Sequence, residues 1–385
     1  MAQAVALNQE MRVSILSLKP KLESTRLSLD GIRIYSPSND YYQLLVTPCS
    51  KVIKDKTINF KRKVLRILWA ILTKVGLQAH LITILERICL GSGFFTLTNF
   101  MEHFDCVCVV SEASMVRSLV SYLKYPKKIQ WIPTDYSVWR KQTYWTREVS
   151  KNDLSIYINY TSIVCLSDGL ADKFVEVLPR LKNKVTSIPN FIDYKTILSK
   201  SIEQSKITVQ SNCINFVTVA RMEEEKQIDK LLDIADSLKN AGKHFHWYMV
   251  GGGSNLGSLQ KKCKELRLDQ FVTFTGAMGN PYSLMSKCDV FVLLSNYEGT
   301  PVTIDEAKVL GLYIVVNNVG GVSDQVTLRF GDVIVGENIV EKMTEVLKGI
   351  CDGQNIDVKA LSDVECETYN CKVYQKLLKL FNSEG

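Results

Sequence analysis

The chain is poor in histidine and has no cysteine arrangement of the kind that binds zinc. Four histidines occur among 385 residues, and the 11 cysteines are scattered except for Cys106 and Cys108, which alternate along an apolar run. Zinc sites pair such cysteines with a second pair or with histidines at short spacing. The pattern favours reduced thiols packed as small hydrophobic side chains over metal ligands or disulfides.

Long apolar segments are also absent. No run reaches the length of about 20 apolar residues that a membrane-spanning helix needs. The apolar stretch near the start is interrupted by Asn8, Glu10 and Arg12, which argues against a secretory signal. We therefore expect a cytoplasmic protein.

The net charge of +7 is modest, but it is concentrated in one segment. Seven basic residues and one acid, Asp55, lie between Lys51 and Arg66, and the apolar run 64–72 with Trp69 overlaps them. Such a segment suits a helix that attaches to an anionic membrane at its inner face. A domain helix with one solvated basic face explains it equally well. No module typical of nucleic-acid binding is present.

Length and patterning predict two α/β domains. A composition of 46% hydrophobic and 23% charged residues is typical of globular proteins, and 385 residues suit two cores better than one. Short apolar runs alternate with longer helical patterns, as in parallel βαβ units. The expected strands are 12–18, 31–35, 104–110, 129–132, 162–166 and 184–188, then 214–220, 245–250, 272–275, 290–294 and 313–316.

The polar stretch 196–213 lacks a convincing period and is predicted to be the linker. It would separate an N-terminal domain, 1–195, from a C-terminal domain, 214–368, with a final helix at 369–385. Doubly wound sheets bind ligands outside the carboxyl ends of their strands. The loops after the strands of the second half are therefore the candidate site.

The first of these loops carries two cations, Arg221 and Lys226, five positions apart. At a strand-to-helix turn they suit an anionic diphosphate, which a guanidinium grips with two hydrogen bonds. Because three glutamates stand between the cations, a solvated charged turn is the alternative.

The second loop is rich in glycine. The motif G-x-G-x-x-G of dinucleotide sites fails at 251–257, because its third glycine falls on Leu256. We expect only a loop that lets the backbone approach a ligand closely.

The most specific pattern is the segment 295–307, in which Glu298 and Glu306 stand eight positions apart. One lies in the loop after a strand and the other in the following helix, so both can face one cleft. Carboxylates accept hydrogen bonds from sugar and ribose hydroxyls, and the N–H groups around 299–302 can take a phosphate or sugar oxygen. Two solvent-facing glutamates are the alternative on spacing alone.

These motifs resemble those of the retaining glycosyltransferases of family four, which carry the signature E-x7-E. The cationic pair, the glycine loop, Thr275-Gly276 and Gly320-Gly321 stand in the order of that family. The turn 188–193, I-P-N-F-I-D, is similar to its I-P-N-G-I-D turn, with Phe191 in place of glycine.

The resemblance implies a GT-B fold, with two Rossmann-like domains facing a central cleft and the donor bound by the C-terminal one. It implies that Arg221 and Lys226 hold the diphosphate, Glu306 the ribose and Glu298 the transferred sugar. The backbone after Gly276 would lie close to the base. The remaining donor-binding residues implied are Asn280, Pro281, Gly299, Thr300, Pro301 and Val302.

Two features depart from the family. Residues 1–10 resemble the first helix, so the preceding strand and glycine-rich loop are expected to be missing. Many members have the turn W-I-H-x-D, whereas this chain reads W-I-P-T-D with Pro133 in place of the histidine. Proline has no ionisable group, so we expect donor binding with weak or no turnover.

The expected reaction is transfer of a hexosyl group from a nucleoside diphosphate sugar, with retention, to a glycan or lipid-linked acceptor in lipopolysaccharide or capsule synthesis. No D-x-D triplet occurs, so neither a metal nor another cofactor is expected. Two alternatives remain: a nucleotide-sugar epimerase, and a degenerate GT-B protein that binds a donor or partner without turnover.

Overall fold

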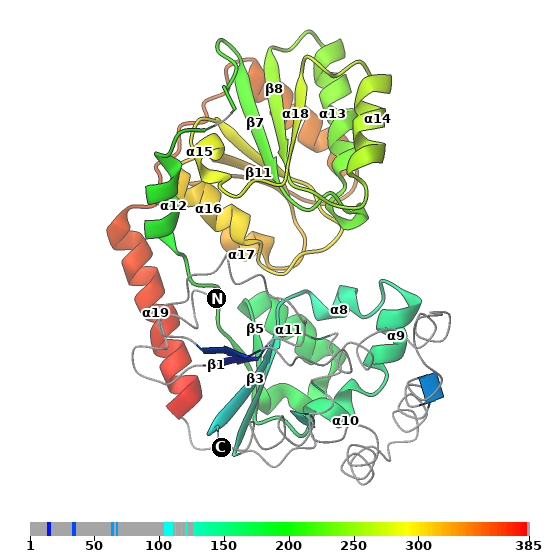
Figure 1. Cartoon of the computed structure of the whole chain (residues 1–385), viewed down its shortest axis with the longest axis vertical. Helices are drawn as coiled ribbons and strands as arrows, with labels where there is room; N and C mark the ends of the chain where they lie inside the picture. The colour runs from blue at the N-terminus through cyan, green and yellow to red at the C-terminus, as the bar shows by residue number, and fades with distance from the viewer. Residues whose placement is uncertain are drawn as a thin grey trace.

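Two α/β domains, each built on a parallel sheet, make up the described part of the chain (Figure 1). The structure is a computed structural model that describes residues 14–16, 33–35, 63, 64, 67, 104–110, 112, 117, 120, 121, 126–205 and 207–382. The predicted helix at 1–10 lies outside these residues. So does the basic segment 51–72, except for Lys63, Val64 and Ile67, which are helical.

The N-terminal domain contains a four-stranded parallel sheet in the order β3-β4-β5-β6. These strands are Cys106–Val110, Lys127–Ile132, Ser162–Cys165 and Val185–Ser187, and β1 (Ser14–Leu16) and β2 (Arg33–Tyr35) form a separate parallel pair. The helices are α8 (Tyr136–Trp139), α9 (Tyr144–Ser150), α10 (Asp153–Tyr157) and α11 (Asp168–Val177), followed by the 3-10 helix η1 (Pro179–Lys184). Apolar side chains of the sheet, α10 and α11 form its core.

The C-terminal domain has six parallel strands in the order β12-β11-β10-β7-β8-β9. They are β7 (Ile214–Val219), β8 (Phe245–Val250), β9 (Val272–Gly276), β10 (Val290–Leu293), β11 (Tyr313–Asn317) and β12 (Gly331–Ile334). The first strand of the domain thus lies between the second and the fourth, which is the strand order of dinucleotide-binding sheets.

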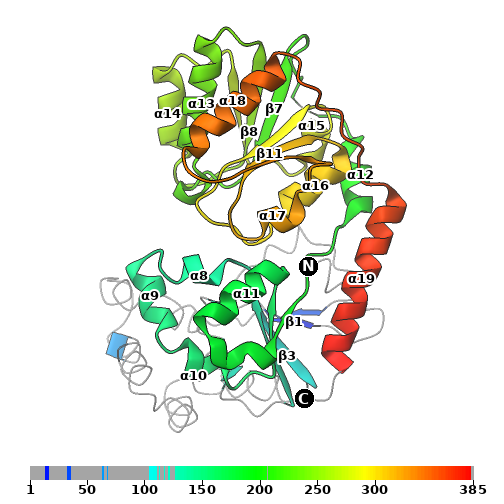
Figure 2. The ribbon, with the colours of Figure 1, turned by 180° about the vertical axis from the view of Figure 1, so that it is seen from behind.

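Helices cover both faces of this sheet. They are α13 (Ile228–Asn240), α14 (Leu256–Glu265), α15 (Tyr282–Met285), α16 (Val302–Leu310), α17 (Val322–Gln325) and α18 (Ile339–Cys351). One core joins the sheet to α13, α14 and α18, and Figure 2 shows α18 in front of the strands. A second core lies on the other face, against α15 and α16. All six residues of β8 are buried, as expected for a strand covered on both sides.

Each predicted strand run contains a strand, but β12 was not predicted. It begins with Gly331 and Asp332, which have low strand propensity. The glycine is required, because a Cβ there would lie 1.9 Å from the carbonyl oxygen of Ile314, at a φ of +146°.

The linker prediction is wrong for residues 196–201, which belong to helix α12 (Tyr194–Ser201). Asp193 caps this helix by accepting a hydrogen bond from the backbone N–H of Thr196. Tyr194 and Ile197 are buried in a cluster that includes Val309 of α16. The helix therefore packs onto the C-terminal domain instead of forming an open connection.

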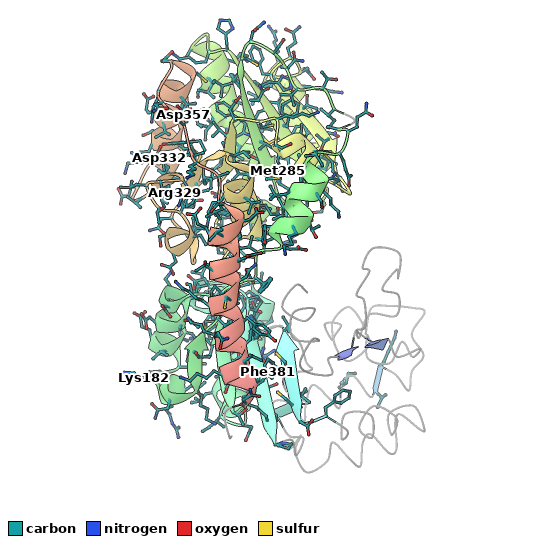
Figure 3. The ribbon with its side chains drawn as sticks, turned by 90° about the vertical axis from the view of Figure 1, so that its left-hand side faces the viewer. Lys182, Met285, Arg329, Asp332, Asp357 and Phe381 are labelled. Atoms are coloured by element: carbon teal, nitrogen blue, oxygen red, sulfur yellow. The ribbon has the colours of Figure 1, made fainter. Side chains whose placement is uncertain are left out.

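The final helix, α19 (Asp363–Asn382), begins six residues earlier than the predicted 369. Figures 1 and 3 show it running from the C-terminal domain back along the N-terminal one. Its residues Val373 and Leu377 join the core of the N-terminal domain. None of the helices in the described part of the chain has the length and apolar character needed to cross a membrane.

Candidate functional site

The candidate site lies where the strand order of the C-terminal sheet reverses, between β7 and β10. The loops after these strands meet there, and the backbone N–H of Asn296 donates to the carbonyl oxygen of Glu225 at 2.8 Å. The side chains of Gln227 and Asn296 add a second hydrogen bond between the loops. Ligands of doubly wound sheets bind at this position.

Lys226 and Glu298 face each other across these two loops. The Lys226 ammonium forms an ion pair with Oε1 of Glu298, and the two side chains are only 15% and 9% exposed. Ser295 Oγ donates to the same carboxylate oxygen at 2.7 Å. Two of the three predicted catalytic residues are therefore in direct contact.

Arg221 has a different environment. Its guanidinium pairs with Glu225 at 2.5 Å, and its side chain is 69% exposed. Among the described residues, Arg221 forms no hydrogen bond or ion pair with Lys226 or Glu298. Because only one guanidinium nitrogen contacts Glu225, the other N–H donors of this exposed side chain remain open to a ligand.

The glycine-rich loop packs closely against the loop after β7. A Cβ on Gly251 would lie 1.8 Å from the carbonyl oxygen of Ala220, and one on Gly253 would lie 2.5 Å from that of Met222. The loop therefore needs glycine at these two positions because it packs against the loop after β7, while its approach to a ligand stays a prediction.

The carboxylate of Glu223 accepts the hydrogen bonds that Ser254 of this loop donates. Glu223 accepts hydrogen bonds from the backbone N–H of Ser254 at 2.9 Å and from its hydroxyl at 2.5 Å. These hydrogen bonds lower the pKa of Glu223. One of the three glutamates between the predicted cations thus has a structural role.

Glu306 lies in α16 and receives a hydrogen bond from the Tyr282 hydroxyl at 2.9 Å. The pKa of this carboxyl is raised to about 7. Burial is the main cause, the Tyr282 hydrogen bond opposes it, and the charge of Asp305 adds to it. A carboxyl with this pKa changes its charge near neutral pH. Sequence reasoning did not identify Tyr282 as its partner.

The predicted base-binding segment is held by α12. Asn280 Nδ2 donates to the Lys200 carbonyl oxygen and to Glu203 Oε2, both at 2.8 Å, while its Oδ1 accepts from the backbone N–H of Tyr282 at 3.0 Å. Its side chain therefore binds the chain itself. Gly276 has a φ of +69° and ends β9, and Pro281 is the N-cap residue of α15.

The start of α16 provides backbone donors. Its N-cap residue is Pro301, which makes no side-chain capping hydrogen bond, and Val302 is 52% exposed. Helix N-termini of this kind attract anions. Thr300 just before it is fixed by Asn190 Nδ2, which donates to its carbonyl oxygen at 3.1 Å and its hydroxyl oxygen at 3.0 Å.

The N-terminal domain contacts this loop through its backbone. Thr134 forms an isolated antiparallel bridge with Gly299, and the Asp135 N–H donates to the Glu298 carbonyl oxygen at 3.2 Å. A Cβ on Gly299 would lie 1.9 Å from the Pro133 carbonyl oxygen. The glycine after Glu298 is thus required by contact between the domains, which its position in the E-x7-E segment alone did not indicate.

Within the described residues, no group of three or more His, Cys, Asp or Glu side chains is arranged to hold a metal ion. Asp305, next to Glu306, pairs instead with Lys308 at 2.7 Å. Its other oxygen accepts a hydrogen bond from Gln325 at 3.0 Å.

Comparison with known proteins agrees with this geometry. Residues 199–358 match the family described as "Glycosyl transferases group 1", so the C-terminal half carries a domain of that family. The chain is 29% identical over 141 residues, 36% of its length, to the putative glycosyltransferase EpsF of Bacillus subtilis, covering 37% of that protein. It is 22% identical over 205 residues, 51% of its length, to the Escherichia coli UDP-Gal:alpha-D-GlcNAc-diphosphoundecaprenol alpha-1,3-galactosyltransferase, covering 53% of it. The match thus spans about half or less of these relatives.

Solved structures match over nearly the whole chain. WaaG, a glycosyltransferase involved in lipopolysaccharide biosynthesis, aligns with a TM-score of 0.61 at 12% identity, covering 99% of this chain and 94% of that one. Anabaena Alr3699/HepE in complex with UDP and glucose gives 0.61 at 14% identity, covering 96% and 100%. These similarities show the fold. The chain has the GT-B fold with two Rossmann-like domains, and that prediction is confirmed.

Proposed function

We propose that this chain is a retaining glycosyltransferase of bacterial polysaccharide or lipopolysaccharide synthesis, which moves a hexosyl group from a nucleoside diphosphate sugar to a glycan or lipid-linked acceptor. The observation that carries the proposal is the buried pair of Lys226 and Glu298 at the point where the strand order reverses. In a nucleoside diphosphate sugar, the bond to be broken joins the sugar to the diphosphate. A cation beside a carboxylate suits this bond, because the cation can bind the phosphate and the carboxylate the sugar hydroxyls.

The donor would be held by residues of the C-terminal domain alone. The diphosphate would bind Lys226, the backbone N–H groups at the start of α16 and the exposed guanidinium of Arg221. The ribose hydroxyls would bind Glu306. The base would lie against the backbone after Gly276.

The chain's own groups can stabilise the leaving diphosphate. When the bond from the sugar to the phosphate breaks, negative charge develops on the phosphate oxygens. Fixed donors that point at such charge contribute on the order of 10²–10³ in rate each. We propose that Lys226 and the α16 N–H groups supply this effect, and that neither a metal nor another cofactor takes part.

The relatives suggest which donor and acceptor to test first. Two HepE structures are complexes with UDP-glucose or with UDP and glucose, and the E. coli relative is named for UDP-Gal and a diphosphoundecaprenol acceptor. We propose a UDP-sugar as donor and an acceptor at the inner membrane face, with the basic segment 51–72 as a peripheral attachment.

A thermal-shift screen across nucleoside diphosphate sugars tests donor binding, because a ligand at 100 times its Kd adds about 2.7 kcal/mol of stability. Incubation with radiolabelled UDP-sugars and diphosphoundecaprenol-linked glycans then separates the activities. A labelled glycan product supports the proposal. A free epimer indicates a nucleotide-sugar epimerase, and binding without product indicates a protein that has lost turnover.

A further inference from the structure

Three consecutive residues, two in the loop after β4 and the first residue of α8, each bind a different charged side chain. Thr134 Oγ1 donates to the Glu112 carboxylate, and Tyr136 OH donates to Asp153 Oδ2 at 2.6 Å. Between them, Asp135 accepts from the Lys173 ammonium at 3.0 Å. Consecutive anchors of this kind fix the backbone of the loop.

Two of these anchors are deeply buried. Glu112 is 4% exposed, and Asp153 is fully buried in an ion pair with Arg117. Burying charged groups is costly unless they are paired and hydrogen-bonded. Because such a buried charged network is costly, we expect it where a backbone position has to be held. Here the backbone of Thr134 forms the bridge to Gly299.

Lys173 connects this loop to the opposite domain. It lies on α11, and its ammonium lies 3.0 Å from Asp135 Oδ2 and donates to the Gly320 carbonyl oxygen at 3.3 Å. Gly320 has a φ of +60°, and a Cβ on it would lie 2.0 Å from the Glu298 carbonyl oxygen. Lys173 therefore contacts two segments, at Asp135 and at Gly320, and each of them lies against the backbone of Glu298.

We infer that Lys173 is a positioning residue that locks the two domains together around Glu298. Its contacts hold the Glu298 backbone from the acceptor side through Asp135 and from the donor side through Gly320. The inference rests on the proposed function. Since the groups proposed to bind the nucleotide all belong to the C-terminal domain, loss of Lys173 should reduce turnover and leave nucleotide affinity unchanged.

The test compares Lys173→Met with the conservative Lys173→Arg and with Lys182→Met. Lys182 is an exposed lysine of η1 at the outer edge of the N-terminal domain (Figure 3), so its substitution makes the same charge change away from the cleft. For each full-length variant we would measure kcat and KM with a UDP-sugar, the Kd of UDP by calorimetry, and the radius of gyration by small-angle X-ray scattering.

Lys173→Met should lower kcat by about 10- to 100-fold, because small misplacements of a reacting group have effects of that size. Its UDP affinity should stay within about twofold of wild type, its radius of gyration should increase, and Lys173→Arg should recover most of the lost kcat. Equal kcat in Lys173→Met and Lys182→Met, or a loss of UDP affinity that matches the loss of kcat, overturns the inference.

The scattering arm separates this inference from the proposed function. If the wild-type chain transfers no sugar, the proposed function fails, and the domain lock is then decided by the radius of gyration alone. An increase in Lys173→Met that is absent in Lys182→Met supports the lock, and equal radii overturn it.

Discussion

Lys226 and Glu298 form a largely buried ion pair between the loops that follow β7 and β10. Each side chain neutralises the other in the absence of a ligand, and Ser295 adds a hydrogen bond to the carboxylate. A diphosphate that binds Lys226 therefore competes with Glu298 for the ammonium. Removing one partner leaves the other charge uncompensated, which makes the two substitutions unequal in their effects.

The first prediction separates the partners of this pair. Lys226→Met should weaken UDP binding by about 1.5–3 kcal/mol, as expected for the loss of charge-assisted hydrogen bonds. Glu298→Gln should tighten UDP binding, because the ammonium is released from its competitor, and should nevertheless lower sugar transfer. Calorimetry with UDP and a transfer assay with the UDP-sugar measure the two effects.

Arg221→Ala is the matched comparison for this prediction. Its effect on UDP affinity should be smaller than that of Lys226→Met, since its guanidinium is exposed and already paired with Glu225. If Glu298→Gln weakens UDP binding as much as Lys226→Met does, the competition between carboxylate and diphosphate is wrong.

The second prediction is a pH dependence of nucleoside binding. Ribose hydroxyls donate to an ionised carboxylate, and burial raises the pKa of Glu306 to about 7. Affinity should therefore rise as the pH increases through about 7 and level off above it. Uridine is a suitable probe because it lacks the phosphate groups that titrate in this range.

Tyr282→Phe tests whether Glu306 is the group that causes this pH dependence. The Tyr282 hydrogen bond lowers the pKa of Glu306, so its loss should move the midpoint to higher pH. Tyr313→Phe removes a comparable hydroxyl, which donates to Asp332 at 2.7 Å, and should leave the midpoint unchanged. A midpoint that is the same in all three proteins would show that Glu306 does not bind the ribose.

Most of the fold was predictable because hydrophobic periodicity records which faces are buried. In α13, for example, apolar residues recur at helical spacing, and those on the inner face are buried: Ile228, Leu231, Leu232, Ala235 and Leu238. The pattern failed at α12, where Tyr194 and Ile197 supply a short apolar face within a polar segment. It also failed at β12. Glycine is needed at position 331 because the backbone there lies close to the neighbouring strand β11, and the sequence of β12 alone does not indicate this contact.

Contacts within the site were predictable from the sequence where both residues follow neighbouring strands of the C-terminal sheet. Contacts with the N-terminal domain were not. Lys226 and Glu298 follow neighbouring strands, so the sheet order brings them together. Arg221 follows the same strand as Lys226 but points to Glu225, because a local ion pair is available. The contact of Gly299 with Pro133 joins residues far apart in the chain, and no local pattern encodes it.

The third prediction concerns that contact. Gly299→Ala should disturb the domain interface, because its Cβ would lie 1.9 Å from the Pro133 carbonyl oxygen. Backbone has to move to relieve such an overlap, so turnover and interface stability should fall. Gly257→Ala in α14 is the control, since a Cβ there meets nothing within 4 Å.

Turnover and thermal unfolding of the two variants measure this effect. Gly257→Ala should resemble wild type, while Gly299→Ala should lower kcat by about tenfold or more. UDP affinity serves as the internal check, because the donor residues themselves are unchanged. Equal behaviour of the two alanine variants would mean that the interdomain bridge is not needed for transfer.

The last prediction concerns Pro133. Its carbonyl oxygen contacts Gly299, and this contact depends on the backbone and not on the proline ring. Pro133→His can therefore add an imidazole at this position while the hydrogen bond of Thr134 and the ion pair of Asp135 hold the loop. Weak turnover in the unmodified chain stays a prediction.

If the proline marks lost chemistry, Pro133→His should raise kcat with little change in UDP affinity, because a positioned histidine contributes roughly 10²–10⁴ as a general acid or base. The gain should vary with pH around the ordinary histidine pKa of about 6.5. Pro133→Gln is the control, since it frees the backbone and adds a polar side chain that does not titrate. An equal gain in both variants would assign the effect to a loosened turn, whereas no gain beside robust wild-type turnover would show that another group already does this work.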